Sequence, residues 1–140
     1  MSRGLSVRPG IRPRFAIGAR AVACNGDVTA PDFGERVVQT AVDAFGDCHI
    51  LVNNAGYTWD SVIQKMTDEQ WYAIIDVHVT APFRILRAFA PHLRTFQEAE
   101  SKRGERIVRK VVNVSSTSGT NGNAGQVNYS SAKAAVTGMT

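Results

Sequence analysis

Short apolar runs alternate with helix-patterned segments along this chain, and this alternation constrains its fold more than any other feature. Residues 50–52 (Ile-Leu-Val) and 111–114 (Val-Val-Asn-Val) have the composition of strands that are buried on both faces. An earlier run at residues 21–24 ends in a turn signal, Asn-Gly-Asp at 25–27. Strands and helices in this order predict an α/β fold with a parallel sheet and helices on both faces.

Two segments carry apolar side chains at helical spacing. The first covers residues 33–45, and Gly46 is placed to end it. The second begins at a capping box, in which Thr67 is followed three residues later by Gln70. Its apolar stripe continues over residues 71–93, which predicts one long helix.

The rest of the chain reads as loops and one further helix. Residues 97–106 are charged and lack apolar periodicity, so we expect an exposed loop there. Gly119, Gly122 and Gly125 are typical of a second loop, and a helix of small residues is expected to begin near Asn128.

The net charge of +4 is confined to one end of the chain and does not indicate a nucleic-acid partner. Residues 1–20 contain five arginines and no acid, and the remainder holds 11 basic and 12 acidic residues. A basic face for tracking a phosphate backbone is therefore not expected. We expect residues 1–18 to be a basic extension rather than a targeting peptide, because Pro9 and Pro13 interrupt any amphipathic helix.

Other broad classes are excluded by simple counts. No run of about 18 apolar residues occurs, so no membrane-spanning helix is expected. Cys24 and Cys48 lack metal-ligand spacing, so we expect reduced, buried thiols and neither a metal site nor a disulfide. These features favour the cytoplasm over the mitochondrion.

Tyr129 and Lys133 are candidate catalytic residues. Four residues apart on a helix, they share one face. A neighbouring ammonium favours the phenolate form of a tyrosine, which can then exchange a proton with an alcohol or carbonyl oxygen. Ser116 follows the strand at 111–114, at the edge where open α/β sheets bind ligands. The alternatives are a surface pair for Tyr129 and Lys133 and an ordinary loop serine for Ser116.

Four segments together resemble the short-chain dehydrogenase/reductase family. Residues 111–116 and the Tyr-Ser-Ser-Ala-Lys run at 129–133 resemble its active-site segment, with the serine-to-tyrosine spacing of 3-oxoacyl-acyl-carrier-protein reductase-like members. Residues 51–56 (Leu-Val-Asn-Asn-Ala-Gly) resemble its Asn-Asn-Ala-Gly motif, and Asp27-Val28 resembles its adenine-contacting pair. The resemblance covers residues 19–140 and implies a doubly wound, Rossmann-like fold.

The resemblance also implies a function, namely an NAD(P)(H)-dependent oxidoreductase that interconverts a hydroxyl and a carbonyl group. Tyr129 would be the general acid/base, Lys133 would favour its phenolate form and hold the nicotinamide ribose, and Ser116 would orient the substrate oxygen. The NAD or NADP cofactor would also contact Asp27, Val28, Asn54, Ala55 and Gly56. The substrate would be a small carbonyl or alcohol, or an acyl thioester, and members of the family form homo-oligomers. A structural role is an equal alternative for Asn53 and Asn54, whose side chains would link neighbouring strands.

His78 departs from the pattern of the family, which commonly has an asparagine at this position. The family's residue contributes a main-chain carbonyl to a proton relay that reaches the lysine. Pro82 has no N–H to donate to the carbonyl of His78, so we expect this carbonyl to serve the relay. A buried histidine that only packs is the alternative.

A second departure concerns the phosphate cradle. A dinucleotide fold needs a Gly-rich turn after its first strand, and no such turn is recognisable here. We therefore expect residues 19–140 to be the central part of one domain truncated at both ends, with the third, fourth and fifth strands of the order 3-2-1-4-5-6. Two functions stay open: an active oxidoreductase, or an inactive fragment that at most associates with a full-length relative.

Overall fold

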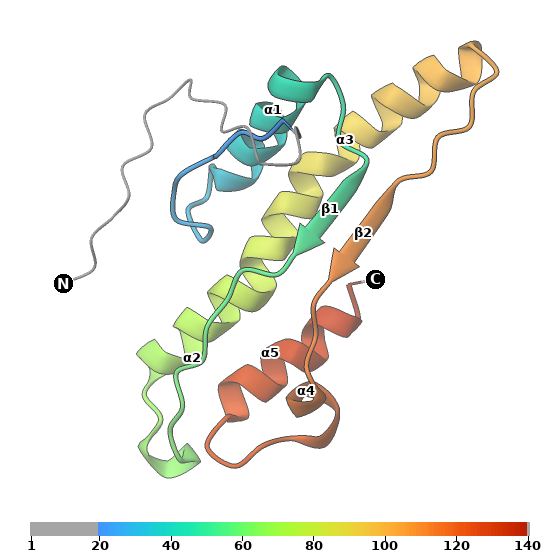
Figure 1. Cartoon of the computed structure of the whole chain (residues 1–140). Coiled ribbons are helices and arrows are strands. Elements are labelled where there is room, and N and C mark those ends of the chain that lie inside the picture. Colours follow the sequence, from blue (N-terminus) through green and yellow to red (C-terminus); the bar gives the residue numbers. More distant parts are fainter. Residues whose placement is uncertain (1–19, 140) are drawn as a thin grey trace.

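The computed structural model describes residues 20–139, and the expected basic extension lies outside them. Figure 1 shows a long diagonal helix with two strands beside it and a shorter helix at their lower end. In chain order the elements are α1 (Phe33–Phe45), β1 (Ile50–Asn53), the 3-10 turn η1 (Ile63–Lys65), α2 (Asp68–Ile75), the π-helical turn η2 (Asp76–Thr80), α3 (Ala81–Lys102), β2 (Lys110–Asn113), α4 (Thr117–Asn121) and α5 (Val127–Thr137).

β1 and β2 form a parallel sheet, as the two apolar runs predict. Their register pairs Ile50 with Lys110 and Asn53 with Asn113. The expected strand at residues 21–24 is wrong, because these residues are not a strand in the structure. A strand is stabilised by hydrogen bonds to a neighbouring strand. Within residues 20–139 the sheet consists of β1 and β2 alone, so residues 21–24 have no strand to pair with.

The sheet is covered unevenly. Leu51 of β1 faces the same cavity as Pro82 and Ile85 of α3, whereas Ile50 and Val52 are 62% and 54% exposed. Helices on both faces were expected, but the described part of the chain covers only one face. The core instead lies mainly between helices, with buried side chains from Phe33, Val38, Ile74, Val77, Ala81, Ile85, Phe89, Ala132 and Val136.

The long helical run confirms its predicted start. The Oγ1 atom of Thr67 accepts from the Gln70 N–H at 3.2 Å, and the Gln70 side chain accepts from the Thr67 N–H at 3.0 Å. The run is interrupted at η2, where the Ala81 N–H donates to the carbonyl of Asp76, five residues back. Pro82 follows directly, and its missing N–H explains why the ladder widens into a π turn here.

The observed helix ends differ in part from those predicted. Residues 97–106 were expected to be a loop, but α3 continues to Lys102 because Gln, Glu, Ala and Lys are strong helix formers. Gly46 ends α1 in the left-handed conformation, as predicted. The loop predicted around Gly119, Gly122 and Gly125 is in part wrong, because its first residues form the short helix α4.

The remaining broad expectations concern membranes, metals and thiols. No helix within residues 20–139 is long and apolar enough to cross a bilayer. In the same residues no three His, Cys, Asp or Glu side chains gather as metal ligands would. Cys24 and Cys48 are free thiols, and both are half-buried rather than fully buried.

Candidate active site

The two strands deliver their following residues to one edge of the sheet, because parallel strands end on the same side. The Nδ2 atom of Asn53 donates to Oδ1 of Asn113 at 2.9 Å, and the Val114 N–H donates to the carbonyl of Asn53 at 3.0 Å. The strand-linking role expected as one alternative for Asn53 is confirmed. Asn54, which follows it, is exposed.

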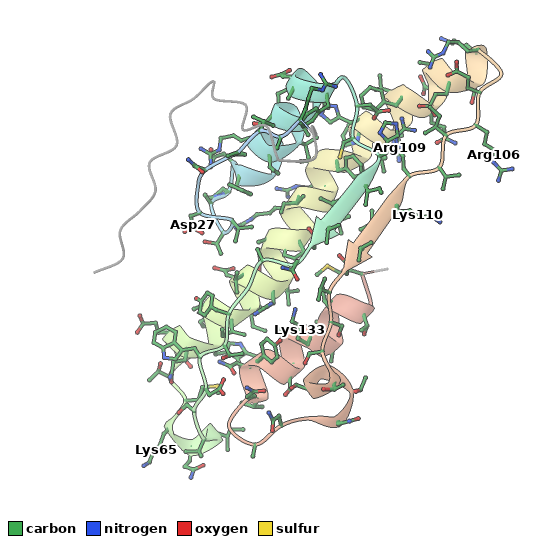
Figure 2. All side chains as sticks on the ribbon, viewed as in Figure 1. Asp27, Lys65, Arg106, Arg109, Lys110 and Lys133 are labelled. Atoms are coloured by element: carbon green, nitrogen blue, oxygen red, sulfur yellow. The ribbon has the colours of Figure 1, made fainter. Side chains whose placement is uncertain are left out.

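α5 brings Tyr129 and Lys133 to this edge. Lys133 is 5% exposed, and its Nζ atom donates to the carbonyl of Val114 at 2.6 Å. The same atom lies 5.7 Å from the centroid of the Tyr129 ring. Burial lowers the pKa of the Lys133 ammonium below its ordinary value. Lys133, labelled in Figure 2, therefore faces the end of β2 beside the Tyr129 ring, and the two residues are not a surface pair.

Ser116 lies at the N-terminus of α4. Its Oγ atom accepts from the Ser118 N–H at 3.2 Å, which caps the helix. The preceding Ser115 donates its hydroxyl to the carbonyl of Lys133 at 2.7 Å. α4 packs closely on α5, since a Cβ atom added at Gly119 would lie 2.7 Å from the carbonyl carbon of Lys133. The serine expected in the site thus begins a helix that is held against the helix of Tyr129 and Lys133.

His78 is buried beside Tyr129. Its Nε2 atom lies 2.8 Å from the carbonyl oxygen of Tyr57, and its ring meets the Tyr129 ring edge-on, with the centroids 5.1 Å apart. Burial lowers the pKa of the His78 imidazole, the bond to Tyr57 raises it, and the Lys133 charge lowers it again. The lowered pKa favours the neutral imidazole at pH 7.

The residues expected to contact the adenosine side separate into two groups. Val28, Asn54 and Ala55 line a mainly apolar cavity of about 310 Å³ between the start of α1, β1 and α3. Asp27 lies outside the lining of this cavity, and its carboxylate accepts from the Thr29 N–H and hydroxyl, both at 2.8 Å. The Thr29 N–H and then its hydroxyl hold the pKa of Asp27 below its usual value.

Gly56 belongs to the other group. A Cβ atom added there would lie 2.0 Å from Cε1 of His78, so the imidazole occupies the space that this glycine leaves. In Figure 2, Asp27 and Lys133 are seen on either side of the segment that follows β1. Val28, Asn54 and Ala55 therefore meet at the cavity, whereas Gly56 packs against His78, whose ring contacts Tyr129.

Sequence reasoning missed Asn128 as a site residue. Its side chain is fully buried, and Nδ2 donates to the carbonyls of Trp59 and Gln70 at 3.1 and 3.2 Å. Its Oδ1 atom accepts from the Tyr129 N–H at 2.8 Å. An asparagine in the first turn of a predicted helix indicates the local bond to the Tyr129 N–H, whereas the bonds to Trp59 and Gln70 are tertiary.

Gln126 was missed as well. Its Nε2 atom donates to the Asp60 carboxylate at 2.9 Å, and its Oε1 atom accepts from Asn123 at 2.9 Å. The Ser61 N–H donates to the carbonyl of Gly125 at 2.8 Å. These bonds tie the segment between β1 and α2 to the loop that precedes Tyr129.

Known proteins are similar to this chain in sequence and in structure. Residues 13–140 match a family described as short chain dehydrogenase. The 3-oxoacyl-(acyl-carrier-protein) reductase FabG of Vibrio cholerae is 40% identical over 114 residues, 81% of this chain and 43% of the relative. The hydroxyacyl-CoA dehydrogenase ChsB1 of Mycobacterium tuberculosis is 38% identical over 123 residues, 88% of this chain and 38% of the relative.

A solved structure agrees. The crystal structure of a short chain dehydrogenase from Mycobacterium avium matches with a TM-score of 0.79 at 38% identity, and the match covers 89% of this chain and 41% of that one. The chain thus spans less than half the length of these relatives. Because the family match covers nearly the whole chain, including both strands and the segment from Ser116 to Lys133, the chain belongs to the short chain dehydrogenase family.

Proposed function

We propose that this chain contributes the acid/base half of an NAD(P)(H)-dependent oxidoreductase site, in which Tyr129 transfers a proton to or from a substrate oxygen. One observation carries the proposal. The buried Nζ atom of Lys133 lies over the Tyr129 ring while it is anchored to the end of β2. The two side chains of α5 thus meet at the end of β2, where a phenol can exchange a proton with the oxygen of a bound substrate.

Ser116 is suited to orienting the substrate oxygen. Its Oγ atom already accepts from Ser118, and a hydroxyl keeps one proton to donate. A hydrogen bond from Ser116 and one from Tyr129 to the same oxygen would polarise a carbonyl and then receive its developing negative charge. The close packing of α4 on α5 limits relative movement of the two side chains.

The residues expected at the adenine and ribose ends of a dinucleotide fit these two groups chemically. The cavity lined by Val28, Asn54 and Ala55 is mainly apolar and falls in the size range of small-molecule sites, which suits the adenine end. Lys133 keeps two further N–H donors for a ribose hydroxyl. When bound, the nicotinamide supplies or accepts the hydride.

The main-chain carbonyl of His78 is assigned to the proton relay toward Lys133. Pro82 cannot donate to it, and the helix is a π turn rather than a regular α-helix at this point. The substrate class is assigned from two relatives whose names specify 3-oxoacyl-acyl-carrier-protein and hydroxyacyl-CoA compounds. Both are acyl thioesters, so a 3-oxoacyl thioester is the preferred test substrate.

The test begins with cofactor binding to the 140-residue chain. NADH and NADPH are titrated separately while the fluorescence of Trp59 and Trp71 is recorded, and saturable quenching at micromolar concentration supports the proposal. Oxidation of the bound cofactor by an acetoacetyl thioester is then followed in the wild type and in Tyr129→Phe. We expect the variant to lose about 10²–10⁴-fold in kcat, the usual contribution of general acid–base catalysis.

A matched control separates the phenol's chemistry from tyrosine replacement in general. Tyr72→Phe changes a side chain that is 64% exposed, and we expect it to keep wild-type quenching and turnover. Equal turnover in wild type and Tyr129→Phe would contradict the assignment of Tyr129 as acid/base.

A second candidate function is association with a full-length relative without catalysis by this chain. The observation in its favour is the open sheet face, on which Ile50, Val52 and Val112 are exposed, because apolar groups in such number are typical of an interface. No quenching by either nucleotide, together with a stable complex between the chain and a full-length relative in sedimentation analysis, would favour this candidate.

A further inference from the structure

The His78 side chain makes two contacts that the proposed function does not use. Its Nε2 atom faces the carbonyl of Tyr57 at 2.8 Å, and its ring meets the Tyr129 ring at 82°. The first contact reaches the segment that carries Asn54 and Gly56, and the second reaches the residue assigned as acid/base. One buried side chain, 4% exposed, therefore touches both halves of the candidate site.

The hydrogen bond fixes where the proton of the imidazole lies. A backbone carbonyl only accepts, so Nε2 carries a proton. In the neutral ring Nδ1 then holds the lone pair. Burial and the neighbouring Lys133 charge both disfavour a second proton. The imidazole is therefore held as one tautomer in one orientation.

The space for this ring is made by a glycine. A Cβ atom at Gly56 would lie 2.0 Å from Cε1 and 2.7 Å from Nδ1 of His78. Such approaches force one of the two groups to move. The imidazole of His78 therefore fits in this position only because residue 56 is a glycine.

We propose that the His78 imidazole is a positioning residue that couples the two halves of the site, holding segment 54–57 through Nε2–H and the Tyr129 ring through its edge contact. This inference rests on the proposed function for its catalytic consequence. An aromatic edge contact favours one placement of the ring and opposes rotation about the Cα–Cβ bond of Tyr129, which would move the phenol oxygen. The phenol is then aimed at one place before substrate arrives.

The two contacts can be removed separately. His78→Gln keeps an N–H near the position of Nε2 and has no ring, whereas His78→Phe keeps a ring and has no donor. Ring flipping of Tyr129 is measured by ¹³C relaxation on aromatic-labelled chain, with the signal assigned by its loss in Tyr129→Phe. Hydrogen exchange of the amides over residues 54–58 is measured on the same samples.

We expect opposite patterns in the two variants. In His78→Gln, Tyr129 flips roughly 2- to 10-fold faster, the rate change equivalent to the loss of one aromatic contact, and exchange over 54–58 stays near wild type. In His78→Phe, exchange over 54–58 rises while Tyr129 flipping stays near wild type. His92→Gln is the matched control, because His92 also contacts an aromatic ring, that of Phe96, and it should change neither measurement.

Gly56→Ala provides an independent route to the same result if either His78 variant fails to fold. The added methyl group displaces the imidazole, so we expect faster flipping of Tyr129 and faster exchange over 54–58. Unchanged flipping in both His78→Gln and Gly56→Ala would overturn the proposal and leave His78 a packing residue.

Turnover separates this inference from the proposed function. If Tyr129 is the acid/base, His78→Gln should lower kcat by about 10- to 100-fold at unchanged KM, the effect of misaimed catalytic groups. A wild-type chain without turnover contradicts the proposed function alone, and the ring-flip measurement still decides the role of His78.

Discussion

The Nζ atom of Lys133 donates to the carbonyl oxygen of Val114 at 2.6 Å, so a buried cation on α5 holds the end of strand β2. The bond uses one of the three N–H donors of the ammonium. It also explains how an ammonium group is kept in a position where burial disfavours its charge. The position of Tyr129, one helical turn earlier, follows from this anchor.

Lys133→Met should change how stability depends on pH. Because burial lowers the pKa of Lys133, the folded chain binds fewer protons than the unfolded chain between the folded pKa and the ordinary value near 10.4. Stability conferred by residue 133 therefore rises as pH increases through this window. The free energy of unfolding is measured in urea at about pH 8 and about pH 10.5. Relative to that of Lys133→Met, the value for the wild type should be greater at the higher pH than at the lower. A difference that is independent of pH would contradict the buried charge.

Asn128 substitutions should separate lost hydrogen bonds from introduced repulsion. Asn128→Ala removes two bonds to carbonyls and one from the Tyr129 N–H, and we expect a loss of about 1.5–4.5 kcal/mol at 0.5–1.5 kcal/mol per bond. Asn128→Asp keeps the shape but turns an acceptor toward two carbonyl oxygens, so it should destabilise more than alanine does. Asn121→Ala, at an exposed residue, should stay within about 0.5 kcal/mol.

The parts of this structure that sequence could predict are those set by neighbours along the chain. The capping box of Thr67 and Gln70 and the helix stop at Gly46 depend on residues within one turn. The missing N–H of Pro82 predicts a disturbed ladder near His78. That the disturbance takes the form of a π turn also depends on how α2 and α3 pack against the same core. Sequence periodicity does not predict this packing.

The parts that could not be predicted depend on distant partners. Asn128 bonds to residues 58 and 69 positions away, and an asparagine at a helix start gives no sign of such partners. Glu100 is buried in a segment that the lack of apolar periodicity predicts to be a loop, and its carboxylate binds the distant Arg109. The candidate site was found because Tyr129, Lys133 and Ser116 follow a family pattern, while their supporting bonds are tertiary.

The ion pairs of Arg109 predict an acid-sensitive contact. Arg109 binds Glu100 through both terminal nitrogens, at 3.0 and 2.5 Å, and also binds Asp47. The Arg109 bond lowers the pKa of Glu100, so the stability that it confers is present above the ordinary pKa of about 4.3 and is lost as pH falls through the folded value.

Glu100→Gln tests this contact. The variant should be less stable than wild type near neutral pH, and the difference should narrow as pH falls below about 4.3, as measured by urea unfolding. Glu98→Gln, on an exposed position of the same helix, should show no such narrowing. A constant difference for Glu100→Gln would contradict the ion pair.

Gly119→Ala should disturb the site through its packing. The added Cβ atom would lie 2.7–2.9 Å from backbone atoms of Lys133 and Ala134, and backbone cannot rotate away as a side chain can. We expect a loss of about 1–3 kcal/mol, the usual range for overpacking, and a shift of α4 away from α5. Gly138→Ala is the matched control, because its Cβ meets its nearest neighbour at 3.4 Å and its φ is −78°. Gly138→Ala should therefore be neutral or slightly stabilising.

Because Ser116 caps α4, the shift in Gly119→Ala should lower turnover more than loss of stability alone explains. Full turnover in a destabilised Gly119→Ala chain would show that Ser116 is not held in place by this contact.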